Sequence, residues 1–361
     1  LHLLHSIKDH PELDIYCPHH EQAAAMAADG YARATGGIGV TVATSGPGAT
    51  NLITGICGAF YDSVPLLCLT GQVSTFRMVE STGVRQIGFQ ETPIVDICQK
   101  ITKYAATLKS PEAIAFELDK CFYYSTSGRP GPTLLDIPDN YQRAMIDPDT
   151  LQRWKPPVRK RNVLEKQSHR LQSKISKAMR LLIAAERPVV IAGWGLHLSN
   201  CEEEFRNFLE KFKVPAVMTW GAADILSQYH QSYVGTFGTH GQRHANFAVQ
   251  NADFILSLGS RLDTKSTGTP VSSFARGAKR VMVDIDGAEI EKFEHFDLPL
   301  NLGVNCDLKE FFDIVANLDQ SARVGDDWAA QITSWKSDFI EFDDLNRAKS
   351  GGLDPYAVID N

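Results

Sequence analysis

The stretch GVTVATSGPGATNLITGICGAFYDSVPLLCLT, residues 39–70, reads as a strand, a glycine-rich turn, a helix and a second strand. Residues 39–43 and 66–70 are short apolar runs that predict buried strands, and residues 50–62 have the apolar spacing of a helix. Two strands joined by a helix form a βαβ unit, in which the strands run parallel. The stretch therefore predicts an α/β domain.

The same alternation extends in both directions from this unit. The other expected elements are a helix over residues 1–8, a strand over 13–17, a helix over 20–35 and a strand over 133–137. Parallel strands that are buried on both faces have nearly continuous apolar sequences, as these have. We assign residues 1–146 to one doubly wound domain with a mostly parallel sheet.

A linker and a second domain follow. Residues 147–170 contain Pro156-Pro157 and the basic run 159–161, and two adjacent prolines cannot continue a regular element. A second alternation fills residues 171–325 and predicts a second parallel-sheet α/β domain of Rossmann-like type. Its expected helices span 171–185, 201–212 and 242–250, and its expected strands span 188–192, 216–219, 254–258 and 280–284. Residues 326–361 are assigned to a helix over 328–344 and a connector.

The composition excludes several classes of protein. Of 361 residues, 43% are hydrophobic and 22% are charged, as in folded globular proteins. The 36 Lys and Arg against 43 Asp and Glu leave a net charge of −7, which offers no general attraction to nucleic acid or to a membrane surface. Seven scattered cysteines without a CxxC pair indicate reduced thiols and a cytoplasmic protein. No residue of this chain is assigned to a metal.

A carboxylate begins the helix expected over residues 20–35. Glu21 lies in the first turn, where the helix dipole stabilises a negative charge whatever the function. The alanine-rich run behind it, residues 23–28, would let the helix pack closely against another element. Glu21 would then lie in a dry interface that raises its pKa, and such a carboxyl can exchange a proton near neutral pH.

Two loops carry the other candidate residues of the first domain. SGPGATN, 45–51, lies between a strand and a helix, at the edge where open α/β sheets bind ligands. Its glycines permit tight backbone geometry, although an ordinary turn has the same composition. GFQE, 88–91, places an aromatic ring and an amide in a loop. Neither loop contains GxxxxGK[ST] or GxGxxG, so a nicotinamide-dependent oxidoreductase is not indicated.

Together and in this order, the motifs resemble the acetolactate synthase branch of the thiamine-diphosphate enzymes. The matching phrases in the first domain are HE (20–21), GYARATG (30–36), TSGPGATN (44–51), PLLCLTGQV (65–73), FQET (89–92) and SGRPGPTLLDIP (127–138). Those in the second domain are AGWG (192–195), GTHGQRHANFAVQNAD (238–253), LGSRLD (258–263) and VDIDGAEI (283–290). The resemblance implies the pyrimidine-binding and central domains of a three-domain fold.

The resemblance also leads us to expect chain beyond these residues. A helix is already under way at residue 1, and another begins near residues 354–359, so the opening strand of the first domain and a further domain are expected outside. The third, diphosphate-binding domain would supply the Mg²⁺ ligands. Its GDG and NN motifs do not occur in the sequence given.

Thiamine diphosphate is the cofactor that the resemblance implies. The glutamate at position 21 would hydrogen-bond a nitrogen of its aminopyrimidine ring and relay a proton. His20 would either touch the substrate or support the site through a hydrogen bond. The other residues implied for this site are Pro47, Asn51, Gly46 and Gly48 around the pyrimidine ring, and the catalytic Gln90 and Phe89 facing the reacting carbonyl groups.

Flavin adenine dinucleotide, in a role without redox chemistry, is the second implied cofactor. The implied contacts are Arg129, Gly193, Gly195, Arg261, Asp284 and Asp307, with Thr219, Gly238 and His240 in the same region. The family's RFDDR phrase reads RLDTK here, residues 261–265, so a lysine keeps the charge of the second arginine but loses its planar fork. A lone GxG, such as 193–195, is also common in ordinary turns.

The implied reaction is decarboxylation of a 2-oxo acid, pyruvate in the first instance, with carboligation of the remaining fragment to a second carbonyl group. Arg85 and Gln86 instead resemble the residues of relatives from polysaccharide or activated-sugar pathways. The segment 137–140 also lacks the lysine that the family has there. A simple 2-oxo acid decarboxylase and a non-catalytic relative that acts in assembly are the alternatives.

The resemblance implies a homodimer or homotetramer, because the pyrimidine-binding domain of one subunit faces the diphosphate-binding domain of its mate. The alanine-rich run 23–28 and the apolar segment 53–60 would then pack against the twofold mate. Alternatively, both segments pack inside their own domain.

Overall fold

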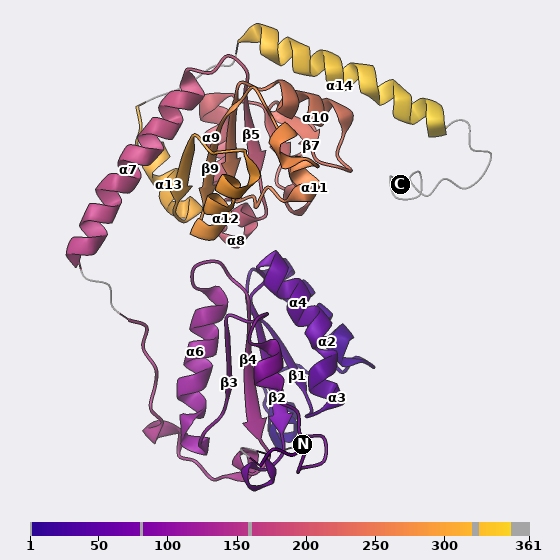
Figure 1. Cartoon of the computed structure of the whole chain (residues 1–361), viewed down its shortest axis with the longest axis vertical. Coiled ribbons are helices and arrows are strands. Elements are labelled where there is room, and N and C mark those ends of the chain that lie inside the picture. Colours follow the sequence, from indigo (N-terminus) through magenta and orange to yellow (C-terminus); the bar gives the residue numbers. More distant parts are fainter. Residues whose placement is uncertain (1, 80–81, 158–160, 320–324, 348–361) are drawn as a thin grey trace. The chain divides into compact units, whose positions relative to one another are not determined.

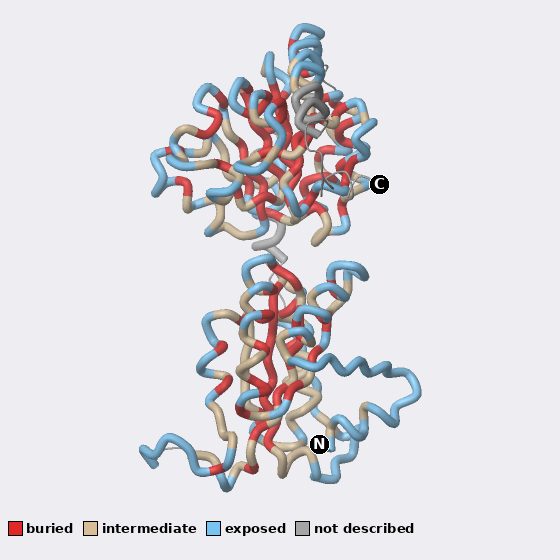
Figure 2. Tube along the Cα trace, turned by 90° about the vertical axis from the view of Figure 1, so that its right-hand side faces the viewer, coloured by how far each residue is buried: buried red, intermediate tan, exposed pale blue. Residues whose placement is uncertain are grey.

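A computed structural model describes residues 2–79, 82–157, 161–319 and 325–347 of the chain (Figure 1). The chain divides into two compact units, Leu1–Val158 and Arg159–Asn361. Each unit contains a parallel sheet with its own buried core, visible as the red segments in Figure 2. The expected fold class, two parallel-sheet α/β domains, is therefore confirmed.

The first unit contains a four-stranded parallel sheet with the strand order β1-β2-β4-β3. Its strands are β1 (Gly39–Ala43), β2 (Leu66–Gln72), β3 (Tyr104–Thr107) and β4 (Pro132–Pro138). Neighbouring side chains of one strand point to opposite faces, so Leu134 and Leu135 of β4 join two different cores. This two-sided burial explains the apolar runs LLCL at 66–69 of β2 and LL at 134–135 of β4.

Helices cover both faces of this sheet, with α6 on one side and α2 and α4 on the other (Figure 1). The helices of the first unit are α1 (His2–Lys8), α2 (Glu21–Thr35), α3 (Pro47–Asn51), α4 (Ile53–Asp62), α5 (Ile94–Cys98) and α6 (Ile114–Thr126). The helix expected over residues 50–62 is thus two helices, joined at Leu52. Gly36 ends α2 in the left-handed conformation, with φ of 67°, and donates its N–H to the carbonyl of Ala32.

Small residues allow α2 to approach α4 and β1 very closely. A Cβ added to Gly55 of α4 would lie 2.4 Å from Cβ of Ala25, and one added to Gly39 of β1 would lie 2.0 Å from the carbonyl oxygen of Ala28. Ala25 and Ala28 therefore serve packing inside the unit. Met26 of the same helix is 50% exposed and does not share this packing, so contact of the run with a twofold mate stays a prediction.

The strand predicted over residues 13–17 is wrong. The structure assigns no strand to these residues, and every one of them is exposed. A strand is stabilised by pairs with a neighbouring strand, and alternating apolar residues such as Ile15 do not supply that neighbour. Conversely, β3 and α6 were not predicted. The four-residue β3 is too short to show a periodicity.

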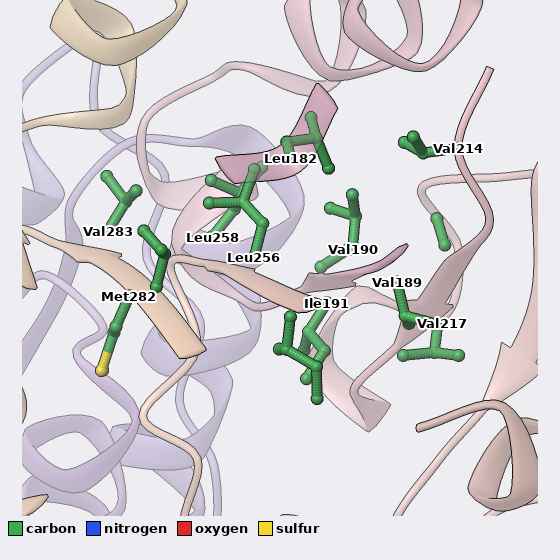
Figure 3. Close-up of a cluster of buried hydrophobic side chains, with 14 of the residues drawn as sticks. Leu182, Val189, Val190, Ile191, Val214, Val217, Leu256, Leu258, Met282 and Val283 are labelled. Carbon is green, nitrogen blue, oxygen red and sulfur yellow. The ribbon is translucent and has the colours of Figure 1, made fainter. Parts of the chain in front are cut away.

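The second unit contains a six-stranded parallel sheet with the order β10-β9-β8-β5-β6-β7. Its strands are β5 (Pro188–Ala192), β6 (Ala216–Met218), β7 (Tyr233–Thr236), β8 (Phe254–Leu258), β9 (Lys279–Asp284) and β10 (Leu302–Asn305). Figure 3 shows buried side chains of four strands, with Val190 and Leu256 on one face of the sheet and Val217 and Met282 on the other. These strands are buried on both faces, as their unbroken apolar sequences predict.

The strand order of this sheet reverses between β5 and β8. From β5 the chain proceeds outward through β6 to β7, and then returns to build β8, β9 and β10 on the other side of β5. In doubly wound sheets, ligands bind at the carboxyl ends of the strands at this reversal. The loops that follow β5 and β8 begin there, at Gly193 and Gly259.

Shorter helices surround this sheet, and two long ones flank it in the sequence. The helices are α7 (Arg161–Ile183), α8 (Gly195–Leu198), α9 (Glu202–Phe212), α10 (Arg243–Asn251), α11 (Thr264–Thr267), α12 (Gly287–Glu291), α13 (Leu308–Ala316) and α14 (Asp326–Arg347). Trp328 near the start of α14 is buried and donates from Nε1 to the carbonyl of Pro188, at 3.2 Å. The beginning of α14 thus packs on the second unit, and the expected connector after 347 lies outside the described residues.

Helix α7 starts at Arg161, inside the segment 147–170 that is predicted as a linker. Neither proline nor glycine occurs between Arg161 and Ile183 to interrupt this helix. The first half is attached to the first unit. Arg153 donates from Nε to Asp119 at 2.7 Å, and the ring of Trp154 lies 5.0 Å from that of Tyr123.

Within the residues that the structure describes, no helix is both long and apolar enough to cross a membrane. All seven cysteines are free thiols, and Cys68, Cys98, Cys121, Cys201 and Cys306 are buried. Burial raises the pKa of Cys98 to about 11, so this thiol stays protonated and unreactive near neutral pH.

Candidate active site

Helix α2 presents Glu21 as its first residue. The preceding residue, His20, has an extended backbone and caps the helix, with Nδ1 accepting the N–H of Gln22 at 3.1 Å. Capping by a side chain satisfies one of the free N–H groups of the first turn. His20 therefore supports the first turn of α2 through a hydrogen bond, and its contact with substrate stays a prediction.

Asn51 binds the Glu21 carboxylate from the loop that follows β1. Nδ2 of Asn51 donates to Oε2 of Glu21 at 3.0 Å, which joins residues 30 positions apart in the sequence. This hydrogen bond, together with a backbone one, lowers the pKa of Glu21 and outweighs the effect of desolvation. The expectation of a raised pKa is wrong for this chain, because Glu21 is only half-buried here and its anion has a donor.

The glycines of the 45–51 loop have separate physical roles. Gly46 has φ of 64°, a left-handed conformation that suits glycine, and it precedes Pro47 at the first position of α3. Gly48 lies beside the carboxylate, since a Cβ there would be 3.4 Å from Oε1 of Glu21 and 2.7 Å from the Thr44 side chain. The backbone at Gly48 thus lies close to Glu21, and a side chain there would be crowded by Thr44.

Gln90 reaches the same place from a third part of the sequence. A Cβ on Gly46 would lie 2.8 Å from Cβ of Gln90 and 3.0 Å from its carbonyl oxygen. Gln90 itself has φ of 64°, an uncommon conformation for a residue with a side chain. Its neighbour Phe89 is 85% exposed. The structure therefore brings Glu21, the 45–51 loop and Gln90 together, with Phe89 at the surface.

A buried polar network behind this site was not predicted. Asp136 of β4, 1% exposed, accepts hydrogen bonds from Oγ1 of Thr70 at 2.7 Å and from Nε2 of Gln72 at 2.9 Å. Nε2 of Gln72 also donates to the carbonyl of Thr92, at 2.8 Å. A carboxylate within the apolar run TLLDIP was the available signal, because a charge in a fully buried strand needs polar partners.

Burial raises the pKa of Asp136 from 3.8 to about 7, although its two hydrogen bonds oppose this change. Between these two pH values, Asp136 is ionised in the unfolded chain but protonated in the folded one. The contribution of Asp136 to stability is therefore fully present below about pH 4 and is lost as the pH rises through about 7. The difference corresponds to a loss on the order of 4 kcal/mol. We expect Asp136→Asn, which stays neutral, to remove this dependence on pH.

Native-state hydrogen exchange of β2 and β4 at pH 5 and pH 7, corrected for intrinsic exchange rates, measures how far the stability falls between these two pH values. Asp14→Asn, at an exposed carboxylate of the same unit, is the control and should keep the wild-type dependence. An equal fall in protection with pH in wild type and Asp136→Asn would assign the dependence to other groups.

In the second unit, the glycines of the 193–195 loop contact backbone of their own chain. A Cβ on Gly193 would lie 2.3 Å from the carbonyl oxygen of Gly259, and one on Gly195 would lie 2.7 Å from its Cα. The N–H of Gly195 donates to that same carbonyl, at 2.9 Å. The close approach that these glycines permit is thus an approach of two loops to each other, at the reversal of the strand order.

The other residues implied for flavin divide between the two units. Asp284 is buried at the end of β9 and accepts the N–H of Asp286 at 2.9 Å, and Asp307 caps α13 by accepting the N–H of Lys309 at 2.8 Å. Arg261 lies 3.7 Å from Asp263. Arg129 belongs to the first unit, where Nε donates to Ser63 at 2.7 Å.

Two aromatic rings of the second unit, which follow neighbouring strands, were not predicted as a pair. The ring of Trp220, after β6, is centred 5.3 Å from that of His240, after β7, and Trp220 is 57% exposed. Among the described residues, no group of three or more His, Cys, Asp or Glu side chains could hold a metal ion.

Comparison with known sequences agrees with this division of the chain. Residues 1–97 match the N-terminal TPP binding domain of thiamine pyrophosphate enzymes, and residues 175–313 match their central domain. Thiamine pyrophosphate is another name for thiamine diphosphate.

Individual relatives show the same similarity. An acetolactate synthase large subunit of Cyanidium caldarium is 35% identical over 335 residues, which is 90% of this chain and 54% of that protein. The acetolactate synthase isozyme 2 large subunit of Escherichia coli is 37% identical over 287 residues, 80% of this chain and 50% of that one. The chloroplastic acetolactate synthase 2 of Nicotiana tabacum is 38% identical over 277 residues, which is 76% of this chain and 40% of that protein. This chain spans about half the length of these relatives.

Proposed function

The chain belongs to the thiamine pyrophosphate enzyme family, whose N-terminal and central domains it carries, and from this we propose that it acts in an acetolactate synthase-like reaction. A 2-oxo acid, pyruvate in the first instance, would lose carbon dioxide, and the remaining fragment would form a carbon–carbon bond to the carbonyl carbon of a second molecule. The observation that carries this proposal is the meeting of Glu21, Asn51 and Gln90 around the 45–51 loop.

The residues present fit the pyrimidine ring of thiamine diphosphate. The cofactor would supply the electron sink for decarboxylation. Glu21 would bind a ring nitrogen and move a proton there, while Asn51 keeps the carboxylate in place through the hydrogen bond to Oε2. Pro47 and the glycines beside it would bound the ring, since a side chain at 48 would approach Oε1 of Glu21.

Gln90 and Phe89 would face the reacting carbonyl groups of the two substrates. Gln90 lies against Gly46, next to the pyrimidine site, and the exposed ring of Phe89 is available for contact with substrate. An amide can donate a hydrogen bond to a carbonyl oxygen on which negative charge develops. Gln90 would thus stabilise the second carbonyl as it is attacked.

The test uses the whole purified protein that contains this chain, with pyruvate, thiamine diphosphate and Mg²⁺, the ion that we propose accompanies the cofactor. We expect carbon dioxide release that requires the cofactor, and a coupled product in which the fragment left from pyruvate is joined to the carbonyl carbon of an acceptor molecule. Release of the free aldehyde alone would indicate a simple decarboxylase. No cofactor-dependent turnover with any 2-oxo acid would favour a non-catalytic relative in an assembly.

The acceptor substrate is proposed to differ from that of biosynthetic acetolactate synthases, as in enzymes of polysaccharide or activated-sugar pathways. Arg85 is exposed in the segment that leads to Gln90, and Gln86 donates from Nε2 to the carbonyl of Glu91 at 3.0 Å. Both residues are thus next to the proposed substrate-facing side chains. Product formation with a panel of carbonyl acceptors tests which acceptor the protein prefers. A clear preference for a second pyruvate would contradict this part of the proposal.

Flavin adenine dinucleotide is proposed to bind at the strand reversal of the second unit. Gly193 and Gly195 follow β5, Arg261 follows β8 and Asp284 ends β9, so all four lie at the carboxyl edge where such sheets bind ligands. We expect a flavin spectrum that does not change during turnover. Equilibrium dialysis that detects no flavin binding to the whole protein would refute this.

We also propose a cytoplasmic homodimer or homotetramer. Seven free thiols agree with a reducing compartment, and the exposed Met26, Tyr31 and Tyr61 of α2 and α4 offer apolar surface for a twofold mate. Sedimentation across a dilution series should show activity falling as the oligomer dissociates. A fully active monomer would contradict the shared site.

A further inference from the structure

We propose that Glu91 is a positioning residue, which holds the loop of residues 82–92 so that Gln90 stays against Gly46 and Phe89 stays at the surface. The inference deepens the proposed function and rests on it for the roles of Gln90 and Phe89. Glu91 itself does not approach Glu21 through any described contact, so it would act through the loop.

The carboxylate of Glu91 gathers three backbone N–H groups. Oε1 accepts from Val79, and Oε2 accepts from Ile87 at 3.0 Å and from Gly88 at 3.3 Å. Val79 precedes the loop, and Ile87 and Gly88 lie in its second half, so one side chain connects the chain before the loop to the second half of the loop. A carboxylate can accept all three bonds because it has two oxygens and no donor of its own.

The backbone of Glu91 adds two further bonds to the same loop. Its N–H donates to the carbonyl of Gly88 at 3.0 Å, and its carbonyl accepts from Nε2 of Gln86 at 3.0 Å. The loop thus closes on Glu91 through both main chain and side chain.

Little else holds this loop in place. Residues 82–87 are all exposed, including Val84 at 52% and Ile87 at 51%, so burial contributes little to their order. At the start of the loop, Thr82 donates from its N–H and from Oγ1 to the carbonyl of Val79, at 3.1 and 2.8 Å. Near its end, Gly88 packs on Val73 and Gln72 donates to the carbonyl of Thr92 at 2.8 Å. Between these anchors, the hydrogen bonds that the structure describes for residues 83–87 run to Glu91, from Gln86 and Ile87.

Gln90 needs such a constraint because its backbone is in an unfavourable conformation. Its φ of 64° persists only where the neighbouring residues hold it. Gly88 and Glu91, which flank the FQ pair, are bonded to each other through both the backbone and the carboxylate. Release of these bonds would let residues 89 and 90 relax to ordinary conformations and would move Gln90 away from Gly46.

The experiment compares Glu91→Gln with wild type in the whole protein. The glutamine has the same shape, but its amide NH₂ would face at least one backbone N–H, so the three bonds cannot all form. Hydrogen exchange of peptides within 82–92, without cofactor, should become roughly 10-fold faster, while β2 and β4 keep their protection. Turnover with pyruvate should fall roughly 100-fold through kcat, with the Kd of thiamine diphosphate unchanged.

Two further variants make the comparison specific. Asp96→Asn changes an exposed carboxylate on the adjacent helix α5 and should match wild type in both measurements. Glu91→Asp keeps the charge but shortens the side chain, so it should restore part of the protection and part of kcat. It also provides a milder change if Glu91→Gln weakens the whole unit.

Exchange in 82–92 that is unchanged in both Glu91 variants would overturn the proposal. Faster exchange in this loop with wild-type kcat would also overturn it, because Gln90 would then need no fixed loop. If wild type shows no cofactor-dependent turnover, the proposed function fails, and the exchange result still decides whether Glu91 holds the loop.

Discussion

Glu21→Gln should lower cofactor-dependent turnover by roughly 10²- to 10⁴-fold, the contribution of a positioned general acid or base. The amide oxygen can still accept the hydrogen bond from Asn51, so the fold should be intact. The amide cannot, however, take up and return a proton at the pyrimidine ring. The loss should appear in kcat for carbon dioxide release from pyruvate, with circular dichroism and thermal unfolding as in wild type.

Glu112→Gln is the control, because Glu112 is a carboxylate in the 3-10 helix Pro111–Ala113 of the same unit. It should retain wild-type kcat, which separates the loss of a particular proton donor from the loss of a charge. The pKa of Glu21, which is lowered in this chain, can also be compared with and without the cofactor, because contact with the pyrimidine ring should change it. An undiminished kcat in Glu21→Gln would remove this residue from the mechanism.

Gly193→Ala should strongly destabilise the second unit. Its methyl group would lie 2.3 Å from the carbonyl oxygen of Gly259 and 2.5 Å from Cα of Ser260, and both are backbone atoms that cannot rotate away. Forced overpacking of this kind costs on the order of 3 kcal/mol. For a unit of this size the Tm of the second unit should fall by roughly 6 to 12 °C.

Gly277→Ala is the matched control in the same unit, because its methyl group would meet only the carbonyl oxygen of Ala252, at 3.9 Å. Differential scanning calorimetry of both variants measures the difference. A Tm of Gly193→Ala equal to that of Gly277→Ala would mean that the 193 and 259 loops separate easily. The close approach would then contribute nothing to the strand reversal.

The strands that bury both faces were predictable from the sequence, because a run such as PVVIA at 188–192 can be stable only inside a sheet covered on both sides. The strand at 13–17 was mispredicted for the complementary reason. Its alternation is local, whereas a strand depends on a partner that local sequence does not reveal. Helix α7 starts at Arg161 and not at the predicted Leu171, because the residues between them contain neither proline nor glycine.

For the candidate site, sequence motifs identified Glu21, Asn51, Gly46 and Gln90, and a resemblance assigned their roles. The motifs could not show that Gln90 packs against Gly46, nor that Glu91 and Asp136 hold polar groups behind and beside the site. Nor could they give the sign of the Glu21 pKa change, which depends on a donor 30 positions away.

The sequence by itself determined the α/β class, the two sheets and the identity of the side chains that can do chemistry, because apolar periodicity and residue type are properties of short segments. Only the tertiary structure decided which of those side chains meet, which glycines are needed and how each carboxyl is charged. Hydrogen bonds, close backbone approaches and desolvation all depend on atoms that are near in space but far apart along the chain.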